Sequence, residues 1–467
     1  MTGPGLFDPS ARFERSLVIL SNRGPVAFAF DDAGLPVARK TGGGLASGVR
    51  PALARSGGLW ICAPLSDADR SVAASLERPI NSDGTEVVFA DVPEGLLDAA
   101  VGRVANEYLW FIHHGMSDLA LTPSSDDWDA FARYNKTMAE AVARSAPEGA
   151  VVAVQDYHLP LVAASLAETR SDLATVHFSH IPFASPEAWR EVDTSRRRSI
   201  AAGLAAHGGC GFHAKRWAER FLSCCELDGI DPPDTYVTQL APDIETMRQH
   251  SRTADAEIER ARLRQTHDGR RLIIRVDRLE PTKNHLAGFD AFADLLERRP
   301  DMIDRVVMVA YAYPSRSGLD VYRKLRDDTV DKVETINRRF GTDAWQPIDL
   351  DLEDNLDAAA AGLTRYDVLL INPVEDGLNL VAFEGAALNT TTGAIVLSRN
   401  CGAHDVLEGC VESIDPTDVA ATSVAIERAL ELPPRERSTR ATEARLRAEA
   451  LSPEEWLDSM LRATVSN

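Results

Sequence analysis

Residues 272–298 read LIIRVDRLEPTKNHLAGFDAFADLLER and contain one complete strand–loop–helix unit. The unit begins with Leu272–Val276, a short and mostly apolar run of the kind found in buried strands. A polar loop with one proline follows, and apolar residues then recur at helical spacing over His285–Arg298. Strands that alternate with helices are typical of α/β proteins with parallel sheets.

The same alternation continues in both directions from this unit. Apolar runs predict further strands at Leu17–Ser21, Val87–Ala90, Val151–Val154, Thr175–Phe178, Val306–Ala310, Val368–Ile371 and Ala394–Leu397. Helical patterns lie at Trp128–Ser145, Leu159–Thr169, Lys215–Leu227, Gly318–Phe340, Asn355–Thr364 and Pro416–Leu430, with Asp354 and Asp415 as expected caps of the last two. We therefore predict an α/β protein with two Rossmann-like, doubly wound domains that face each other across a substrate cleft.

A polar segment at 228–234, Asp-Gly-Ile-Asp-Pro-Pro-Asp, interrupts the alternation near mid-chain. We place an N-terminal Rossmann-like domain at 1–235 and a C-terminal one at 236–450. The remaining residues, 451–467, are predicted to form a helix that packs back on the N-terminal domain.

Composition narrows the class of protein. The chain has 467 residues, with 71 Asp and Glu against 50 Lys and Arg, so its formal net charge is −21. This acidity argues against binding to nucleic acid or to acidic membranes, both of which need excess basic residues. Six cysteines without a CxxC pair indicate reduced thiols, and no apolar run is long enough for a signal peptide or membrane span. We expect a soluble cytoplasmic protein and leave open whether it forms a homo-oligomer.

Two segments contain candidate anion-binding groups. Lys40-Thr-Gly-Gly-Gly-Leu-Ala-Ser-Gly48 offers backbone N–H groups to an anion, although a structural glycine turn explains it equally well. Arg278 and Lys283, in the loop after the 272–276 strand, are spaced to clamp a diphosphate. Alone, these two would be read as solvated cations.

A third segment, Asn372–Asn379, follows a buried strand and leads into a helix. Backbone N–H groups at such a turn can donate hydrogen bonds to an anion. Glu384, one or two turns into that helix, is placed to accept two hydroxyls of a sugar such as a nucleotide ribose.

Polar residues also follow two adjacent strands of the first domain: Asp156 and His158 after one, and His180 after the next. They predict contacts to substrate hydroxyls. A hydrolase triad is disfavoured because no G-x-S-x-G motif is present, and a metal site is disfavoured because no HExxH motif or His/Cys cluster is present. Asp349-Leu350-Asp351 has the DxD pattern of metal-dependent sugar transferases, but we interpret it as part of a solvated acidic loop, 349–354.

Together these motifs make the chain similar to glycosyltransferase family 20, the trehalose-6-phosphate synthases, and to the actinobacterial branch of that family. The matching segments are Ser21-Asn22-Arg23, Gly43-Gly44-Leu45, Gly57-Gly-Leu-Trp60, Leu109-Trp110, Asp156-Tyr-His-Leu159, His180-Ile-Pro-Phe183, Arg278 with Lys283, Pro314-Ser-Arg316, Ile336-Asn337 with Gly341, and Asp376-Gly-Leu-Asn-Leu-Val-Ala-Phe-Glu384. Their order over most of the chain makes the resemblance specific.

The resemblance implies a GT-B fold and transfer of glucose, with retention, from a nucleotide-diphosphate glucose to glucose 6-phosphate. It implies no metal and no other cofactor, and these two small molecules as the only substrates. The C-terminal domain would then bind the donor and the N-terminal domain the acceptor.

The resemblance also implies roles for individual residues. Asp156, His180, Arg278 and Lys283 would be catalytic, with His180 at the 6-hydroxyl of the donor glucose and Asp156 also lining the acceptor sugar. Donor-binding residues would be Gly43, Gly44, Asp376, Gly377, Leu378, Asn379, Leu380, Val381 and Glu384. Acceptor-binding residues would be Arg23, Trp110 and Arg316. We expect the four cations among these residues to create a local positive cleft inside an acidic shell; they are Arg23, Arg278, Lys283 and Arg316.

The chain departs from the family pattern at several positions. On the acceptor side, Ile61-Cys62-Ala63, Ala99-Ala100-Val101 and Phe111-Ile-His-His114 replace the usual aromatic motifs. In other motifs, His213 replaces Gln, Asn284 replaces Gly, Thr364 replaces Arg, and Asn372 replaces Thr. With these changes the chain resembles the actinobacterial branch of the family and its pseudo-glycosyltransferase relatives, in which GDP-linked donors occur. That resemblance implies GDP-glucose rather than UDP-glucose as the donor.

Other functions remain open at this stage. One is a pseudo-glycosyltransferase that joins a nucleotide-activated cyclitol to an amino-cyclitol phosphate. Another is a sugar-phosphate sensor without activity. An NAD-dependent dehydrogenase is remote, because the glycine fingerprint is absent.

Overall fold

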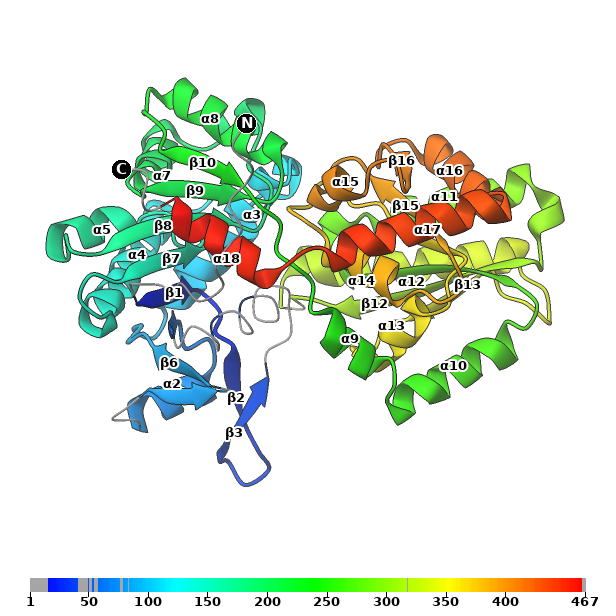
Figure 1. The fold of residues 1–467 in the computed structure, drawn as a ribbon, viewed down its shortest axis with the longest axis horizontal. Coiled ribbons are helices and arrows are strands. Elements are labelled where there is room, and N and C mark those ends of the chain that lie inside the picture. The colour runs from blue at the N-terminus through cyan, green and yellow to red at the C-terminus, as the bar shows by residue number, and fades with distance from the viewer. Residues whose placement is uncertain are drawn as a thin grey trace, which may run out of the picture. The chain divides into compact units, whose positions relative to one another are not determined.

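A computed structural model describes residues 16–40, 49, 53, 58–75, 79–82, 84–316 and 318–463 of the chain. The chain divides into two compact units (Figure 1). Unit 1 comprises Met1–Thr238 and Pro453–Asn467, and unit 2 comprises Gln239–Ser452. Strand β10 (Asp234–Val237) pairs with β9 (Gly209–Phe212) inside unit 1, so a boundary after residue 235 would divide a strand.

Unit 1 is built on an eight-stranded sheet with the order β10-β9-β8-β7-β1-β4-β6-β5. Neighbouring strands are parallel except for β5 and β6. The other six strands are β1 (Leu17–Ser21), β4 (Leu59–Cys62), β5 (Ile80–Ser82), β6 (Thr85–Phe89), β7 (Val151–Gln155) and β8 (Ala174–Ser179). The strand order reverses between β1 and β7, where sheets of this type bind their ligands.

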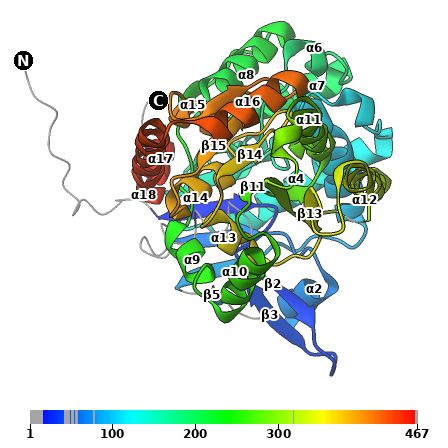
Figure 2. The same ribbon diagram turned by 90° about the vertical axis from the view of Figure 1, so that its right-hand side faces the viewer.

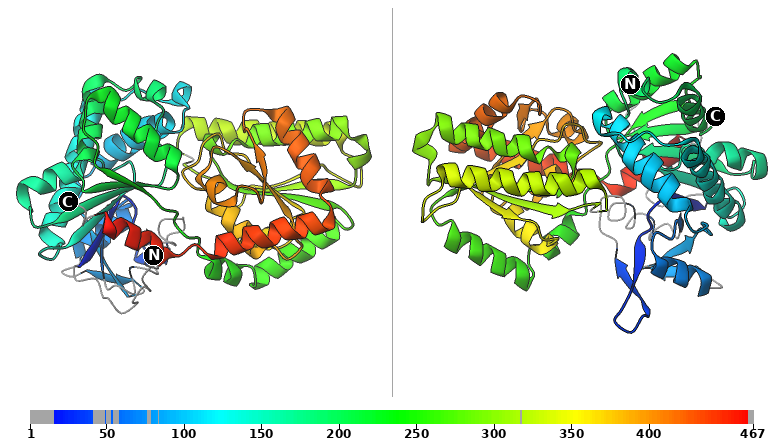
Figure 3. Two further views of the ribbon diagram at one scale, coloured as in Figure 1. Left: turned by 45° about the horizontal axis from the view of Figure 1, so that its top comes forward. Right: turned by 180° about the vertical axis from the view of Figure 1, so that it is seen from behind.

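The described helices of unit 1 cover this sheet. They are α2 (Asp67–Ser75), the π-helix η1 (Asp98–Leu109), α3 (Trp110–His113), the 3₁₀ turn η2 (Ser117–Leu119), α4 (Ser125–Ser145), α5 (Val162–Thr169), α6 (Pro186–Trp189), α7 (Thr194–Ala205) and α8 (Lys215–Asp228). β2 (Val26–Phe30) and β3 (Pro36–Lys40) form a separate antiparallel hairpin. The last helix, α18 (Pro453–Arg462), drawn in red in Figure 3, belongs to unit 1. It packs against β8, and its buried residues are Trp456, Leu457 and Met460.

Unit 2 has a six-stranded, fully parallel sheet with the order β13-β12-β11-β14-β15-β16. Its strands are β11 (Arg271–Leu279), β12 (Val306–Pro314), β13 (Ile348–Asp351), β14 (Val368–Ile371), β15 (Ala394–Ser398) and β16 (Glu412–Ile414). Numbered within the unit, this order is 3-2-1-4-5-6, that of a Rossmann domain. The switch point lies between β11 and β14.

Helices cover both faces of this sheet (Figure 2). On one face lie α11 (His285–Arg298), α12 (Asp320–Phe340) and α16 (Val419–Glu431); on the other lie α13 (Leu356–Leu363) and α14 (Leu380–Leu388). The remaining elements are α9 (Ile244–His250), α10 (Ala254–Thr266), α15 (Gly402–Leu407), α17 (Pro434–Glu449) and the 3₁₀ turns η3 (Pro281–Lys283) and η4 (Pro300–Met302). Phe289, Phe292 and Leu296 form the buried stripe of α11 in the core.

Three local predictions are wrong. The N-caps of α13 and α16 are Asn355 and Asp418, not Asp354 and Asp415, since each helix starts later than its pattern suggested. Asp349 does not belong to a solvated loop. It lies in the edge strand β13, where its Oδ2 accepts hydrogen bonds from Arg262 (2.6 Å) and His267 (2.9 Å), so Asp349 ties α10 and the residue after it to the sheet.

The thiols agree with their predicted state. All six cysteines are unbridged and buried. Among the described residues, no helix combines the length and apolar character needed to cross a bilayer.

Candidate active site

The predicted site residues of unit 2 lie at and beyond the carboxyl ends of three neighbouring strands, β12, β11 and β14, and the switch point lies between the last two. Lys283 lies in η3 and places its Nζ 2.6 Å from Oδ2 of Asp376 and 3.4 Å from Oδ1 of Asp277. Burial alone would lower the pKa of Lys283, but these two carboxylates raise it above its ordinary value. Lys283 is therefore a permanently charged, well-held cation at the edge of the sheet.

Two arginines accompany this lysine. Arg278 lies within β11, opposite Tyr313, and not in the loop after the strand as predicted, because the pairing with β12 continues to Leu279. The Arg278 side chain is 43% exposed, and its Nη1 lies 2.7 Å from Oε1 of Glu280. Arg316 follows β12 with a left-handed φ of 44° and donates from Nη1 to the hydroxyl of Tyr322 at 3.2 Å.

The turn into α14 is held by its own side chains. Asn379 has a left-handed φ of 70°, and its Nδ2 donates to Oδ2 of Asp376 at 3.2 Å. The N–H of Leu378 donates to the other oxygen of Asp376 at 3.2 Å. A side chain at Gly402 would collide with the carbonyl of Gly377, so the backbone at residue 402 packs closely against this turn.

Leu380 and Val381 open α14 directly after this turn. The first N–H groups of a helix lack partners within the helix and attract anions. The structure therefore brings together Arg278, Lys283, the turn 376–379 and the start of α14, as predicted.

Glu384 lies on α14 beyond these residues and is partly buried. Burial raises the pKa of its carboxyl to about 7, and the negative charge of Asp243 adds to the rise. Near neutral pH the group is therefore a mixture of ionised and protonated forms. The ionised form can accept two hydroxyls, whereas the protonated form must donate one hydrogen.

We expect a nucleotide-diphosphate glucose to bind more tightly as the pH rises from 6 to 8. Glu384 loses its proton across this window, because its pKa is about 7. If it holds a ribose through two accepted hydroxyls, the dissociation constant measured by calorimetry without acceptor should fall by up to about tenfold. Glu384→Gln should remove this pH dependence. An equal slope in the two proteins would exclude Glu384 from the nucleotide site.

In unit 1, Asp156 and His180 meet where β7 and β8 end side by side, as predicted. Asp156 has a left-handed φ of 72° and donates its N–H to the carbonyl of Phe178 at 2.7 Å. Its Oδ1 accepts the N–H of His180 at 3.3 Å. His158 is buried and stacks on Tyr157, with 4.0 Å between ring centroids, so it serves the core.

Both ring nitrogens of His180 are engaged. Nε2 lies 2.9 Å from Oε1 of Gln155, and Nδ1 lies 3.1 Å from Nε2 of His213. Burial lowers the pKa of His180 well below its ordinary value, and the neighbouring His213 and His177 lower it further, so the imidazole is neutral near pH 7. Trp456 of α18 lies beside it, with 5.9 Å between ring centroids. A sugar hydroxyl would have to replace one of these two partners to reach a ring nitrogen.

The Ser21-Asn22-Arg23 turn follows β1 and is anchored from the core. Ser21 Oγ donates to the carbonyl of Arg23 and accepts from Nε1 of Trp60, both at 2.7 Å. Tyr134 donates to Oδ1 of Asn22 at 2.7 Å. These contacts explain the Ser and Asn of this motif and the Trp of the Gly57-Gly-Leu-Trp60 motif: they fix the backbone that carries the exposed Arg23.

The other acceptor residue of unit 1, Trp110, opens α3 and is buried. Its ring packs against His114, with 4.2 Å between centroids, and against Tyr157, with 5.7 Å between centroids. Gly43 and Gly44 lie outside the described residues.

Two departures from the family pattern, Asn284 and Asn372, lie in contact with each other. Asn284 adopts φ 59°, a left-handed conformation that glycine adopts most easily and asparagine tolerates. Asn372 donates from Nδ2 to the carbonyl of Asn284 at 3.2 Å and accepts from Nη1 of Arg275 at 2.6 Å. Arg275, fully buried, also donates to the carbonyl of Lys283. The two asparagines therefore stabilise the loop that carries Lys283.

Sequence reasoning gave no role to three buried charged residues here: Arg275, Asp277 and Glu280. A signal was present for Arg275, which lies inside the predicted strand 272–276, because a charged residue inside a buried strand must be paired. With them, the site has four cations (Arg275, Arg278, Lys283 and Arg316) near three carboxylates (Asp277, Glu280 and Asp376). The expected excess of positive charge is largely balanced locally.

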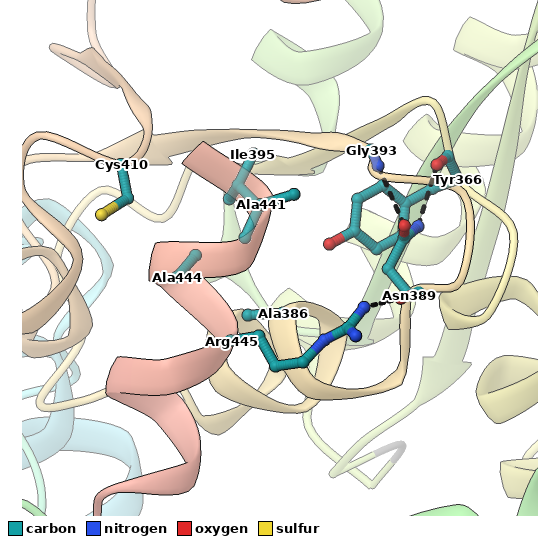
Figure 4. Close-up of a pocket in the computed structure, with 9 residues that line it drawn as sticks. All are labelled: Tyr366, Ala386, Asn389, Gly393, Ile395, Cys410, Ala441, Ala444 and Arg445. Carbon is teal, nitrogen blue, oxygen red and sulfur yellow. Dashed lines mark hydrogen bonds between the residues drawn. The ribbon is translucent and has the colours of Figure 1, made fainter. Parts of the chain in front are cut away.

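A separate pocket in unit 2 contains none of the predicted site residues (Figure 4). Arg445 of α17 reaches across it to the carbonyl of Asn389, and Asn389 donates to the carbonyl of Tyr366 at 2.9 Å. Cys410 also lines it, and burial raises the pKa of that thiol. The pocket belongs to the packing of α17 on α14 and β15.

Comparison with known proteins gives the family. A sequence model described as glycosyltransferase family 20 matches residues 15–465. The trehalose-6-phosphate synthase of Mycolicibacterium gilvum (strain PYR-GCK) is 30% identical over 98% of this chain and 95% of its own. An α,α-trehalose-phosphate synthase of Aspergillus niger, named as UDP-forming, is 27% identical over 93% and 87% of the two chains.

A solved structure gives the fold. The UDP-forming α,α-trehalose-phosphate synthase of Burkholderia xenovorans, in complex with glucose 6-phosphate, superposes with a TM-score of 0.84 at 24% identity. The match covers 97% of this chain and all of the other. The predicted GT-B fold with two Rossmann-like domains is confirmed.

Proposed function

Because the chain belongs to glycosyltransferase family 20, we infer that it is a trehalose-6-phosphate synthase, which transfers glucose from a nucleotide-diphosphate glucose to glucose 6-phosphate. The observation that carries the proposal is the set of groups at the β11–β14 switch point. There Arg278, Lys283 and the start of α14 offer positive charge beside a turn, 376–379, whose polar groups suit a sugar.

We assign donor binding to unit 2. Arg278 and Lys283 meet the diphosphate, helped by the first N–H groups of α14 at Leu380 and Val381. The turn 376–379 donates hydrogen bonds to the glucose hydroxyls and accepts hydrogen bonds from them. Glu384 accepts hydrogen bonds from the ribose hydroxyls. A negative charge grows on the diphosphate as the glycosidic bond breaks, and preorganised cations stabilise it.

The resemblance assigns Arg23, Trp110, Asp156 and Arg316 to the acceptor, and we keep that assignment as part of the proposal. Arg23 and Arg316 would bind the phosphate of glucose 6-phosphate, since guanidinium groups match phosphate oxygens in a fork. Gly43 and Gly44 are assigned to the donor phosphates by the resemblance alone.

The proposed mechanism is a front-face displacement with retention. The bond from C1 of glucose to the phosphate oxygen breaks, and a bond from C1 to the acceptor hydroxyl oxygen forms on the same face. The hydroxyl proton passes to the leaving phosphate oxygen, so that the enzyme chiefly positions two sugars. We propose that side-chain cations and a helix terminus supply all the positive charge, without a metal or other cofactor.

For the donor base, GDP-glucose remains our proposal. It rests on the departures from the family pattern, two of which, Asn284 and Asn372, act on loop geometry. The Aspergillus niger relative is named as UDP-forming, which supports UDP-glucose as the competing donor.

The test is incubation of the protein with glucose 6-phosphate and GDP-, UDP- or ADP-glucose in parallel. We expect α,α-trehalose 6-phosphate, identified by mass spectrometry and by the anomeric NMR couplings, with the highest kcat/KM for GDP-glucose. A higher kcat/KM for UDP-glucose would reverse the proposed base. No disaccharide phosphate from any donor would refute the synthase, and product only from an amino-cyclitol phosphate with a cyclitol nucleotide would establish the pseudo-glycosyltransferase.

A further inference from the structure

Glu280 is a fully buried carboxylate between two arginines that the proposed reaction uses. Its Oε1 lies 2.7 Å from Nη1 of Arg278 and accepts the hydroxyl of Ser315 at 3.0 Å. Ser315 directly precedes Arg316 in the turn after β12. One carboxylate oxygen therefore holds both the end of β11 and the turn that carries the second arginine.

The charge of Glu280 is maintained by its surroundings. Burial would raise its pKa, but Arg278, Arg316 and Lys283 together hold it below its ordinary value. The second oxygen, Oε2, has no hydrogen-bond partner among the described residues. A buried carboxylate with such limited solvation is kept ionised by cations and is costly to retain unless it has a role.

Arg316 is also held by a contact with α12. Arg316 reaches the hydroxyl of Tyr322 at 3.2 Å, and its guanidinium carbon lies 5.8 Å from the centre of that ring. Tyr322 is 2% exposed, so it is part of the core. Arg316 is thus fixed by α12 on one side, and its turn is fixed by Glu280 on the other.

We propose that Glu280 is a positioning residue that sets the spacing between the donor diphosphate at Arg278 and the acceptor phosphate at Arg316. The inference rests on the proposed function, because that function assigns the two arginines to the two substrates. Transfer requires the two sugars at a defined separation, and a misplacement of about 1 Å can cost roughly 100-fold in rate. Glu280 touches neither substrate in this scheme and acts through the arginines.

The experiment compares Glu280→Gln with a matched control, Glu259→Gln. Glu259 is also a buried carboxylate of unit 2, bonded to an arginine (Arg262, 2.7 Å) and to a hydroxyl (Tyr311, 2.6 Å), but it contacts no residue assigned to substrate. We expect Glu280→Gln to lower kcat about 100-fold and to raise KM for both substrates. Glu280→Asp keeps the charge and should recover part of both losses. Glu259→Gln should leave both KM values unchanged.

A double-mutant cycle separates positioning from a general loss of structure. If Glu280 acts in part through Arg278, then Glu280→Gln should reduce the rate of an Arg278→Ala enzyme by clearly less than the about 100-fold expected in the wild-type enzyme, because the effects of coupled residues do not add. Additive effects, or a fall in kcat with unchanged KM values and no recovery in Glu280→Asp, would overturn the proposal. Turnover by the wild-type enzyme is measured first, so that failure of the synthase function is distinguished from failure of this inference.

Discussion

Arg278→Ala should lower kcat by about 100- to 1,000-fold, a loss of about 2.7–4 kcal/mol in transition-state stabilisation. The charge on the leaving diphosphate is greater in the transition state than in the bound substrate, so a cation at this position acts mainly on kcat. The side chain is 43% exposed at the end of β11 and held by Glu280, so it is preorganised rather than mobile. The measurement is steady-state formation of trehalose 6-phosphate with both substrates varied.

Two further variants make this result specific. Arg278→Lys keeps a point charge without the planar fork and should be intermediate. Arg339→Ala removes an exposed arginine of α12 that pairs with Glu297 at 2.8 Å, and it should leave the rate unchanged. If kcat of Arg278→Ala stays within about threefold of wild type while its fold is intact, Arg278 does not meet the diphosphate.

The fold was predictable where strands are apolar throughout. β1, β14 and β15 are buried along their whole length and read as continuous apolar runs. β9, with the sequence Gly-Cys-Gly-Phe, was missed because glycines hide a strand that its neighbours bury. β10, with Asp-Thr-Tyr-Val, was missed because it is a partly exposed edge strand without an apolar run. This is also why the predicted boundary at 235 fell inside β10.

The site was predictable in part, because parallel strands bring their carboxyl ends to one edge and the motifs follow those strands. Asp156 with His180, and Lys283 with Asp376, were brought together in this way. The hydrogen-bond and ion-pair partners of each side chain depend on how deeply it is buried, and burial cannot be read from the sequence. The engagement of both His180 nitrogens, the pairing of Arg278 with Glu280 and the buried Arg275 therefore emerged only from the structure.

Lys283→Met should destabilise unit 2 by about 3–5 kcal/mol at pH 8, because removal of one partner of a buried ion pair leaves the other uncompensated. Asp277, whose side chain is only 1% exposed, would keep only Arg275 at 3.7 Å. Asp376 would keep the weaker bonds from Asn379 and Leu378, at 3.2 Å each. Urea unfolding followed by hydrogen exchange of β11 and β14 peptides reports on this unit.

The pH dependence of that loss identifies its cause. Burial already raises the pKa of Asp277, and removal of Lys283 takes away the cation that opposes the rise. A carboxyl with a raised pKa binds more protons in the folded state, so the variant should regain stability as the pH falls from 8 to 5, and the difference from wild type should shrink. Lys332→Met, which breaks a surface pair with Asp290 of 2.7 Å, should change stability by no more than about 1 kcal/mol at either pH. A loss in Lys283→Met that is the same at pH 5 and pH 8 would mean that packing of the lysine stem, rather than its charge, stabilises the turn.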